Sequence, residues 1–422
     1  MNKIGKQHLG KQRKTDNQVN GFPILTMPSP EKIYLDNNAT TPLDERVKSS
    51  IVEALDLWAN PSSTNDNARK AAEMIMEARG HLGNMFNVNN ESIVFTSGGT
   101  ESNNWVIDGA IRNAKNKLRT EIPHVITTNI EHPSILEPLK RREEAGEITV
   151  TYVSVQPSTG FVTTSSILES LKSTTCLVTI MLANNETGVL QPVSDICNAI
   201  RQKAGKNLPF LHSDVAQAAG KIPVNVKELG VDAITVVGHK FYGPRNGALI
   251  FNPIFNVRIP PMMLGGNQES GWRSGTENTP MIVGLGEAAR VYNENSQIIE
   301  NILRQNRDTF EQLLLKFLPK GHLVHFHGSP RLPNTSSLSF IDYPSNASEL
   351  LEKCQTFTAS TGAACHKHEC SPTLQACGIP FVLASKTIRV SFGKSTSLDE
   401  IKSVVNELAQ LCAAPQQEEG PS

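Results

Sequence analysis

Strand-like and helix-like segments alternate through the first two thirds of this chain. Short apolar runs bounded by turn residues predict buried strands, and longer runs with apolar residues every three or four positions predict helices between them. Such alternation is typical of an α/β domain with a largely parallel sheet. The predicted strands are residues 92–96, 124–128, 148–155, 176–183, 209–213, 232–237 and 248–251. The predicted helices are residues 45–57, 68–85, 100–114, 135–145 and 193–203.

A long helical stretch, about residues 281–317, leads out of this region into a part with shorter segments. The runs in that part predict a smaller α+β unit. They cover residues 322–327, 335–340, 348–354, 387–391 and 398–411. We therefore expect a disordered N-terminal tail (1–30), a large α/β domain (31–290), a small α+β domain (291–415) and a frayed end (416–422). The N-terminal tail is basic, but it has too few apolar residues for a mitochondrial transit peptide.

Composition and charge argue against several classes of function. Of the 422 residues, 38% are apolar and 19% charged, and the formal net charge is −1. This balance gives no electrostatic reason to expect nucleic acid or a membrane surface as a partner, and no apolar run approaches the roughly 20 residues of a membrane span. The 7 cysteines are odd in number and lack a disulfide rhythm, and no secretory signal is seen. We therefore expect reduced thiols and a cytosolic (cytoplasmic) protein.

The residues that follow the predicted strands matter most, because the ligand site of a parallel sheet lies at the carboxyl ends of its strands. The run 232–237 is followed at once by Gly238-His239-Lys240 and then by a Gly-Pro turn. A lysine held at a strand end beside apolar residues is partly desolvated, which lowers the pKa of its amine and suits it to form a Schiff base. A surface lysine at a strand end is the alternative reading of Lys240.

Four other strand ends carry polar groups that suit a cofactor. Gly99 and Thr100 lie where a strand gives way to a helix, whose free N–H groups bind anions. His132 can stack on a flat ring, and the amide of Asn185 can donate hydrogen bonds to a ring oxygen or a carboxylate. Asp214 follows an apolar run, and a buried carboxylate needs a cationic partner such as a protonated pyridine nitrogen. Each of these residues also has a purely structural reading as a helix cap, a loop hydrogen bond or an ion pair.

Together, the five strand ends predict a site for pyridoxal 5'-phosphate. That cofactor requires a phosphate cradle, a stacking ring, an acid for its ring nitrogen and a lysine amine. The coincidence of all four features is more specific than any one of them. The glycine loop matches neither a Walker loop nor a GxGxxG motif, so nucleotide binding is not favoured.

The chain also resembles the class V branch of the fold-type I pyridoxal-phosphate enzymes, which contains the cysteine desulfurases and selenocysteine lyases. The resemblance runs from Ile33-Tyr-Leu-Asp-Asn-Asn-Ala-Thr-Thr-Pro42 to Ser385-Lys-Thr-Ile-Arg-Val-Ser-Phe-Gly393, nearly the whole folded chain. It implies a large cofactor-binding domain with a mostly parallel seven-stranded sheet, a smaller α+β C-terminal domain, and a homodimer with shared active sites.

The resemblance implies a role for each residue that matches a family motif. Lys240 would carry the cofactor as an internal aldimine, and Asp214 would pair with the pyridine nitrogen. His132 would stack on the ring, and Gln217 would contact the ring hydroxyl.

Contacts to the phosphate and to the substrate follow from the same resemblance. The residues implied to hold the phosphate are Gly99, Thr100, His239 and, reaching the neighbouring subunit, Thr276. Asn185 would bond the ring hydroxyl or the substrate carboxylate, and Arg389 would grip that carboxylate with two hydrogen bonds. One phosphate contact departs from the pattern, because Val237 stands where the desulfurases carry a serine.

A second centre of chemistry lies in a loop of small residues, 360–372, around Cys365. The basic residues 366–368 favour its thiolate. In the family the catalytic cysteine lies in a Gly-(Ser/Ala)-Ala-Cys motif, which Gly362-Ala-Ala-Cys365 matches. No second pair of metal ligands is evident, so we expect no metal. The competing reading is a zinc site formed by Cys365, His366, His368 and Cys370.

Local sequence favours a lyase over a desulfurase. Segments 237–245 and 275–281 are similar to animal selenocysteine lyases, and His-Lys-His follows the loop cysteine where desulfurases typically have Thr-Ser. Pro133 departs from the animal lyases, which often have an acidic residue there. The resemblance therefore implies breakdown of L-selenocysteine to L-alanine with release of selenium for reuse. Lys240 would take the α-proton, and Cys365 would act as acid or selenium acceptor.

Two other functions stay open at this point. The first is a cysteine desulfurase that forms a persulfide on Cys365, and the second is a non-catalytic aminotransferase-like scaffold with a metal-binding Cys/His loop. The partners expected for the lyase are L-selenocysteine, a second copy of the chain and a selenium-accepting protein, without nucleic acid or membrane.

Overall fold

The computed structural model describes residues 18–19, 22–23, 32–118, 122–203, 208–255, 257–318, 320–361 and 370–413. The chain divides into two units, residues 1–32 and 33–422. In the first, β1 (Gln18–Val19) pairs antiparallel with β2 (Phe22–Pro23). The rest of the predicted N-terminal tail and the predicted frayed end lie outside the described residues. The second unit carries the fold and the predicted site.

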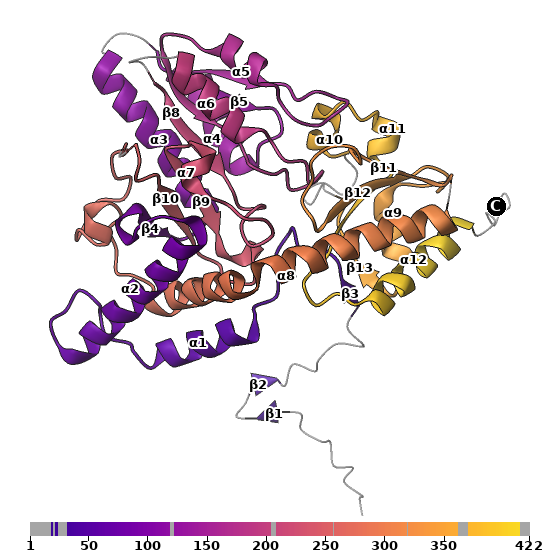
Figure 1. Ribbon diagram of the computed structural model, residues 1–422, viewed down its shortest axis with the longest axis horizontal. Helices are drawn as coiled ribbons and strands as arrows, with labels where there is room; N and C mark the ends of the chain where they lie inside the picture. Colours follow the sequence, from indigo (N-terminus) through magenta and orange to yellow (C-terminus); the bar gives the residue numbers. More distant parts are fainter. Residues whose placement is uncertain are drawn as a thin grey trace, which may run out of the picture. The chain divides into compact units, whose positions relative to one another are not determined.

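A seven-stranded sheet forms the centre of the second unit (Figure 1). Its strands lie in the order β4-β10-β9-β8-β7-β5-β6. Neighbouring strands are parallel except at β10, which is antiparallel to both β4 and β9. The prediction of a mostly parallel seven-stranded sheet is thereby confirmed. The strands are β4 (Ile93–Thr96), β5 (His124–Thr128), β6 (Thr149–Val153), β7 (Thr175–Thr179), β8 (Phe210–Asp214), β9 (Ala233–Val237) and β10 (Gly247–Phe251).

Helices cover both faces of this sheet, so its central strands are buried on both sides and have nearly continuous apolar sequences. On β10, Ala248 and Ile250 pack into the core of one face, and Leu249 and Phe251 into the core of the other. One face is covered by α3 (Gly99–Leu118) and α4 (Pro133–Glu144). The other is covered by α1 (Glu45–Leu55), α2 (Asp66–Phe86), α5 (Thr164–Ser170), α6 (Val193–Lys203), α7 (Val226–Leu229) and the first turns of α8 (Thr279–Phe317).

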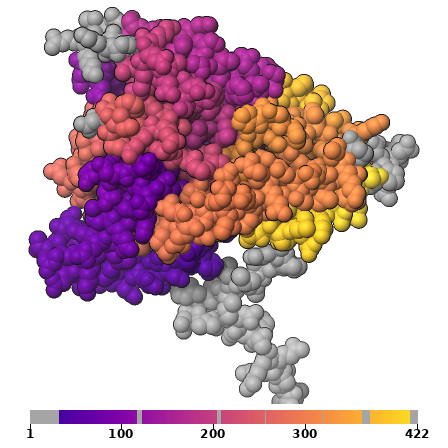
Figure 2. Space-filling view, in the orientation of Figure 1, coloured from indigo at the N-terminus to yellow at the C-terminus, as the bar shows by residue number. Residues whose placement is uncertain are grey.

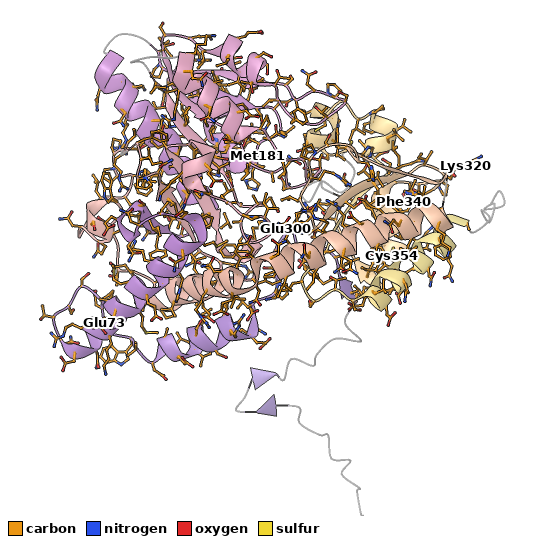
Figure 3. All side chains as sticks on the ribbon, in the orientation of Figure 1. Glu73, Met181, Glu300, Lys320, Phe340 and Cys354 are labelled. Atoms are coloured by element: carbon orange, nitrogen blue, oxygen red, sulfur yellow. The ribbon has the colours of Figure 1, made fainter. Side chains whose placement is uncertain are left out.

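The C-terminal part is built on a smaller antiparallel sheet of β11 (His322–Val324), β12 (Thr335–Phe340) and β14 (Thr387–Ser391). Its core includes Phe340 and Cys354, whereas Met181 belongs to the core of the large sheet (Figure 3). The helices here are α9 (Ala347–Lys353), α10 (Pro372–Ala376), α11 (Phe381–Ala384) and α12 (Leu398–Ala413). The smaller α+β unit predicted from the sequence is therefore present, while the predicted boundary at residue 290 stays a prediction.

Two segments link the regions around the two sheets. Helix α8 packs against α1 and α2 along its first part and against α12 along its second (Figure 2). Near the start of the unit, β3 (Ile33–Tyr34) pairs parallel with β13 (Phe357–Thr358). The segment that follows β3 then passes close to the carboxyl ends of the large sheet, where its residues contact the predicted site.

One predicted strand, 176–183, is shorter than expected. The observed strand, β7, ends at Thr179, although Leu182 still donates its main-chain N–H to Asp214 of β8. On the other side, Met181 N–H is taken by the Glu131 carboxylate, so a side chain replaces the backbone partner that β5 would supply. The main-chain hydrogen bonding between β5 and β7 therefore ends before the apolar run 176–183 does.

Among the described helices, none is long and apolar enough to span a membrane.

Candidate active site

Lys240 ends a short 3-10 turn, Gly238–Lys240, that follows β9 directly. Its Nζ donates to the main-chain oxygens of Asn38 and Ala39, each at 2.8 Å. Burial, helped by the Arg389 guanidinium, lowers the pKa of Lys240 to about 8 against the opposing effect of nearby carboxylates. On the order of a tenth of the amine is therefore unprotonated at pH 7, far more than for an ordinary lysine, and the neutral form is the one that acts as a nucleophile or a general base.

Asp214 ends β8, and its side chain is buried. Its Oδ2 accepts a hydrogen bond from Asn103 Nδ2 at 2.8 Å, and its Oδ1 accepts one from Ala216 N at 2.9 Å. Both partners are neutral, and no ion pair joins this carboxylate to a cation in the part of the chain that the structure describes. A buried carboxylate of this kind suits a cationic ligand group.

The ring of His132 is tied to Asp214 through two intermediate side chains. His132 caps the N-terminus of α4, where its Nδ1 accepts the N–H of Ser134 at 3.1 Å and Pro133 takes the first helical position. Ser134 Oγ lies 2.8 Å from His132 Nδ1 and 2.8 Å from Asn103 Nδ2. Because Nδ1 acts as an acceptor, the ring proton resides on Nε2 and is available to a ligand.

A cavity of about 420 Å³ opens between the first turns of α3 and α4. This is within the range of small-molecule sites. Just before α3 the main chain is open, because a Cβ added at Gly98 would meet no atom within 4 Å. The cavity is lined by Thr100, Asn104, His132, Pro133, Ser134, Glu137, Pro138 and Arg141. The structure thus brings the predicted phosphate threonine and the predicted stacking histidine to one space.

Gly99 packs directly against Val237, the residue that departs from the serine of the desulfurases. A Cβ on Gly99 would lie 2.6 Å from Val237 Cγ2, so this contact leaves room for glycine alone. The side chain of Val237 therefore makes an apolar contact with Gly99 at the position where the desulfurases have a serine hydroxyl.

We expect Gly99→Ala to lower the free energy of unfolding by about 1–3 kcal/mol, because the added methyl group overpacks a buried contact. Urea unfolding of the purified protein measures the change. The matched control is Gly328→Ala, since a Cβ there would meet no atom within 4 Å, and its change should stay within about 0.5 kcal/mol. Combining Gly99→Ala with Val237→Ala should restore most of the loss. Equal losses at Gly99 and Gly328 would contradict the overpacking argument.

Gln217 and His239 lie beside the lysine. Gln217 Nε2 donates to Asn38 O at 3.0 Å, the same carbonyl oxygen that accepts from Lys240. His239 Nδ1 lies 3.1 Å from Thr40 Oγ1. Burial, with Lys240 as the nearest cation, lowers the pKa of His239 to about 4, so the ring is neutral at physiological pH. A neutral imidazole can still donate one hydrogen bond to a phosphate.

Arg389 reaches this site from β14 of the smaller sheet. Its Nη2 contacts Asp36 Oδ1 at 2.5 Å, and its Nη1 donates to the main-chain oxygen of Asn185 at 3.0 Å. Its Nε is buried without a hydrogen-bond partner among the described residues. The two contacts hold the guanidinium in place at the site.

The described contacts of the single chain do not join Thr276 to this group. Thr276 is exposed and makes no hydrogen bond to the other site residues in the described part of the chain. Cys365, together with the alternative zinc ligands His366 and His368, lies outside the described residues. Within the described ranges, no cluster of His, Cys, Asp and Glu could hold a metal ion.

Sequence reasoning did not assign several residues that organise the site. They are Asp36, Asn38, Asn103, Ser134 and Lys221. Asp36 and Asn38 lie inside the 33–42 motif, and Asn103 and Ser134 lie within three positions of Thr100 and His132, so proximity to those residues was the available signal. Lys221 follows Gln217 by four positions, and the one indication in the sequence that it belongs to the site was a basic residue among apolar neighbours.

Comparison with known proteins places the chain in a defined group. The family model described as Aminotransferase class-V matches residues 33–404. A selenocysteine lyase of Rattus norvegicus is 43% identical over 420 residues, which cover 93% of this chain and 96% of the relative. A cysteine desulfurase of Nostoc sp. is 37% identical, with 90% and 92% covered. A solved structure named NifS-like protein is 30% identical, with a TM-score of 0.81, and the match covers 90% of this chain and 99% of that one.

Proposed function

This chain belongs to the class V aminotransferase family, whose members of this branch depend on pyridoxal phosphate, and we propose that it is a selenocysteine lyase. The reaction is the breakdown of L-selenocysteine to L-alanine with release of selenium. One observation carries the choice of substrate: identity to the rat selenocysteine lyase is higher than to the Nostoc desulfurase over nearly the whole chain.

The described residues fit pyridoxal phosphate. The buried carboxylate of Asp214 has only neutral partners, which suits a protonated ring nitrogen. The bare backbone at Gly98 and the first turn of α3 suit a phosphate. His132 lines the adjoining cavity with its exposed ring, and Lys240 presents an amine with a pKa of about 8. These features support the roles that the family motifs imply for Asp214, His132 and Lys240.

Bound pyridoxal phosphate supplies an electron sink for the charge that develops when the Cα–H bond of the substrate breaks. Lys240, as a neutral amine, accepts that proton, and its lowered pKa makes the neutral form available at working pH. Arg389 would pair with the substrate carboxylate, while Asp36 and the Asn185 carbonyl hold the guanidinium still. Asn185 contributes its side-chain amide to the same carboxylate or to the ring hydroxyl.

Cys365 is proposed as the acid or selenium acceptor on the strength of its motif, Gly362-Ala-Ala-Cys365. As a thiol, Cys365 can protonate the departing selenium. As a thiolate, which the basic residues that follow favour, it can attack the substrate selenium, so that an S–Se bond forms while the C–Se bond breaks and its electron pair stays on the carbon that becomes the methyl group of alanine. Delivery of the selenium to an accepting protein would complete the reuse of the element.

A cysteine desulfurase is the second candidate, favoured by the Nostoc relative and by the NifS-like solved structure. The two activities share the proton transfer at Lys240 and differ in the atom that Cys365 receives. In the desulfurase, Cys365 attacks the substrate sulfur and keeps it as a persulfide.

Alanine release measured side by side from L-selenocysteine and L-cysteine tests the proposal. We expect selenocysteine to be turned over much faster, with the purified protein yellow from its cofactor. Comparable turnover of cysteine would favour the desulfurase. A colourless protein that takes up no added pyridoxal phosphate would overturn both activities.

We further propose a homodimer in which Thr276 serves the site of the second copy. Thr276 is exposed here, and two large apolar side chains that a monomer would leave in water, Trp58 and Leu264, are 83% and 80% exposed. Sedimentation equilibrium checks this, since a mass near 46.1 kDa, that of one chain, would contradict it.

A cytosolic, reducing location completes the proposal. The cysteines in the described part of the chain are free thiols, as expected of a protein kept under reducing conditions. Imaging of the tagged full-length chain tests it, and accumulation within an organelle would contradict it.

A further inference from the structure

Lys221 is a buried lysine that the reaction described above does not use. It follows Gln217 by four residues, and its side chain is only 4% exposed. Its Nζ donates to Gln217 Oε1 at 2.8 Å and to Asn38 Oδ1 at 3.1 Å. Both acceptors are uncharged amides, and no acidic residue forms an ion pair with it in the described part of the chain.

Burying this lysine is unfavourable for the fold. Burial lowers its pKa well below the ordinary value, and the cations Lys240 and Arg389 act in the same direction. A buried ammonium without a carboxylate partner costs free energy that a methionine or leucine would not. A residue that is costly to bury and lies beside a reactive site is a candidate for a functional role.

The chemistry of lysine determines what its neighbours present. Lys221 Nζ donates to an amide oxygen on each side, and a lysine amine has the two N–H donors that this needs in either protonation state. Gln217 is thereby held with Oε1 toward Lys221 and Nε2 toward the cofactor side, where Nε2 donates to Asn38 O. The second N–H of this amide has no partner among the described residues and is left for a ligand oxygen.

Asn38 is held in the same way. Its Oδ1 accepts from Lys221 and from Asn334 Nδ2, and its Nδ2 donates to Thr335 Oγ1 at 2.9 Å. With the side chain fixed on both edges, the main-chain oxygen of Asn38 accepts from Gln217 and from Lys240 Nζ. Lys221 thus donates to the side chains of Gln217 and Asn38, and these two residues lie next to the Lys240 amine.

We propose that Lys221 is a positioning residue that fixes the amides of Gln217 and Asn38, so that Gln217 presents an N–H donor to the ring hydroxyl of the cofactor. The inference rests on the proposed function, because it assigns the ligand of Gln217 as pyridoxal phosphate. If Lys221 is lost, Gln217 Oε1 loses its donor, and the amide is held only by the hydrogen bond from Nε2 to the main-chain oxygen of Asn38, so its second N–H is less firmly directed at the ring hydroxyl.

The experiment measures the dissociation constant of pyridoxal 5'-phosphate for the full-length chain after removal of bound cofactor. Lys221→Met keeps the length of the side chain and removes its donors, and we expect it to weaken binding about tenfold. The matched control, Lys227→Met, changes an exposed lysine six positions away and should bind like the parent protein. Lys221→Leu serves as a second apolar variant if the methionine variant does not fold.

A double-mutant cycle separates positioning from a structural role. If Lys221 acts through Gln217, then Lys221→Met should add little to the loss caused by Gln217→Ala, whereas a general loosening of the fold would add its full effect. The pH midpoint of the visible absorbance of the lysine-bound cofactor should also shift in Lys221→Met. Additive losses, an unchanged dissociation constant, or failure of both apolar variants to fold would overturn the positioning role. If the parent protein itself binds no cofactor, the proposed function fails as well, so the two failures are distinguishable.

Discussion

Lys240→Ala is expected to abolish alanine formation from L-selenocysteine, with a loss of roughly 10⁴-fold or more, because the variant lacks the amine that we propose to hold the cofactor and to take the α-proton. The rate of alanine release by the purified variant measures the loss. Borohydride treatment followed by mass analysis supplies a second readout. It should fix the cofactor on the peptide that contains Lys240 in the parent protein and on no peptide in the variant.

The control for this experiment is Lys227→Ala, an exposed lysine on α7 that should retain full activity. A residual rate above about 1% in Lys240→Ala would exceed what positioning by the other residues accounts for, and it would mean that another group removes the proton. Borohydride labelling at a different lysine would contradict the assignment even if activity were lost.

Asp214→Asn is expected to slow the reaction by roughly 10²- to 10⁴-fold. The substitution keeps the shape of the side chain, so the bond from Asn103 can persist, but it removes the only charge that would hold a protonated ring nitrogen. Loss of one partner of a buried charge pair costs about 3–5 kcal/mol, which converts to that range of rates. Steady-state kinetics with L-selenocysteine give the number.

The matched substitution is Asp195→Asn, at an exposed acid in the first turn of α6. It should leave kcat within a factor of about 2, since exposed charges contribute little. If Asp214→Asn instead raises KM alone and leaves kcat intact, the carboxylate contributes only to ground-state binding, and its assignment to the ring nitrogen is wrong.

Much of the fold was predictable because it depends on local patterns. Each of the seven predicted strands of the large sheet is present, since a short apolar run between turn residues leaves few alternatives to a buried strand. Where the prediction was wrong, at the end of β7, the cause was not local. Glu131, about 50 positions earlier in the chain, takes the main-chain N–H of Met181 and ends the ladder there.

The site was predictable in part for a related reason. Carboxyl ends of parallel strands meet at one edge of a sheet, so Lys240 and Asp214 were expected together before any contact was known. Contacts between side chains distant in sequence were not predictable. Asn103 meets Asp214 across 111 positions, and Lys221 meets Asn38 across 183, and no periodicity in the sequence encodes such pairs.

The sequence by itself determined the order of strands and helices along the chain, the residue types at each strand end and the resemblance to a pyridoxal-phosphate family. Those properties follow from hydrophobic periodicity and from motifs, which are local. The tertiary structure alone decided which polar atoms face one another. It placed Arg389 beside Asp36, and it buried Lys221 between two amides at the reactive lysine, because the direction of a side chain is settled only when distant segments pack together.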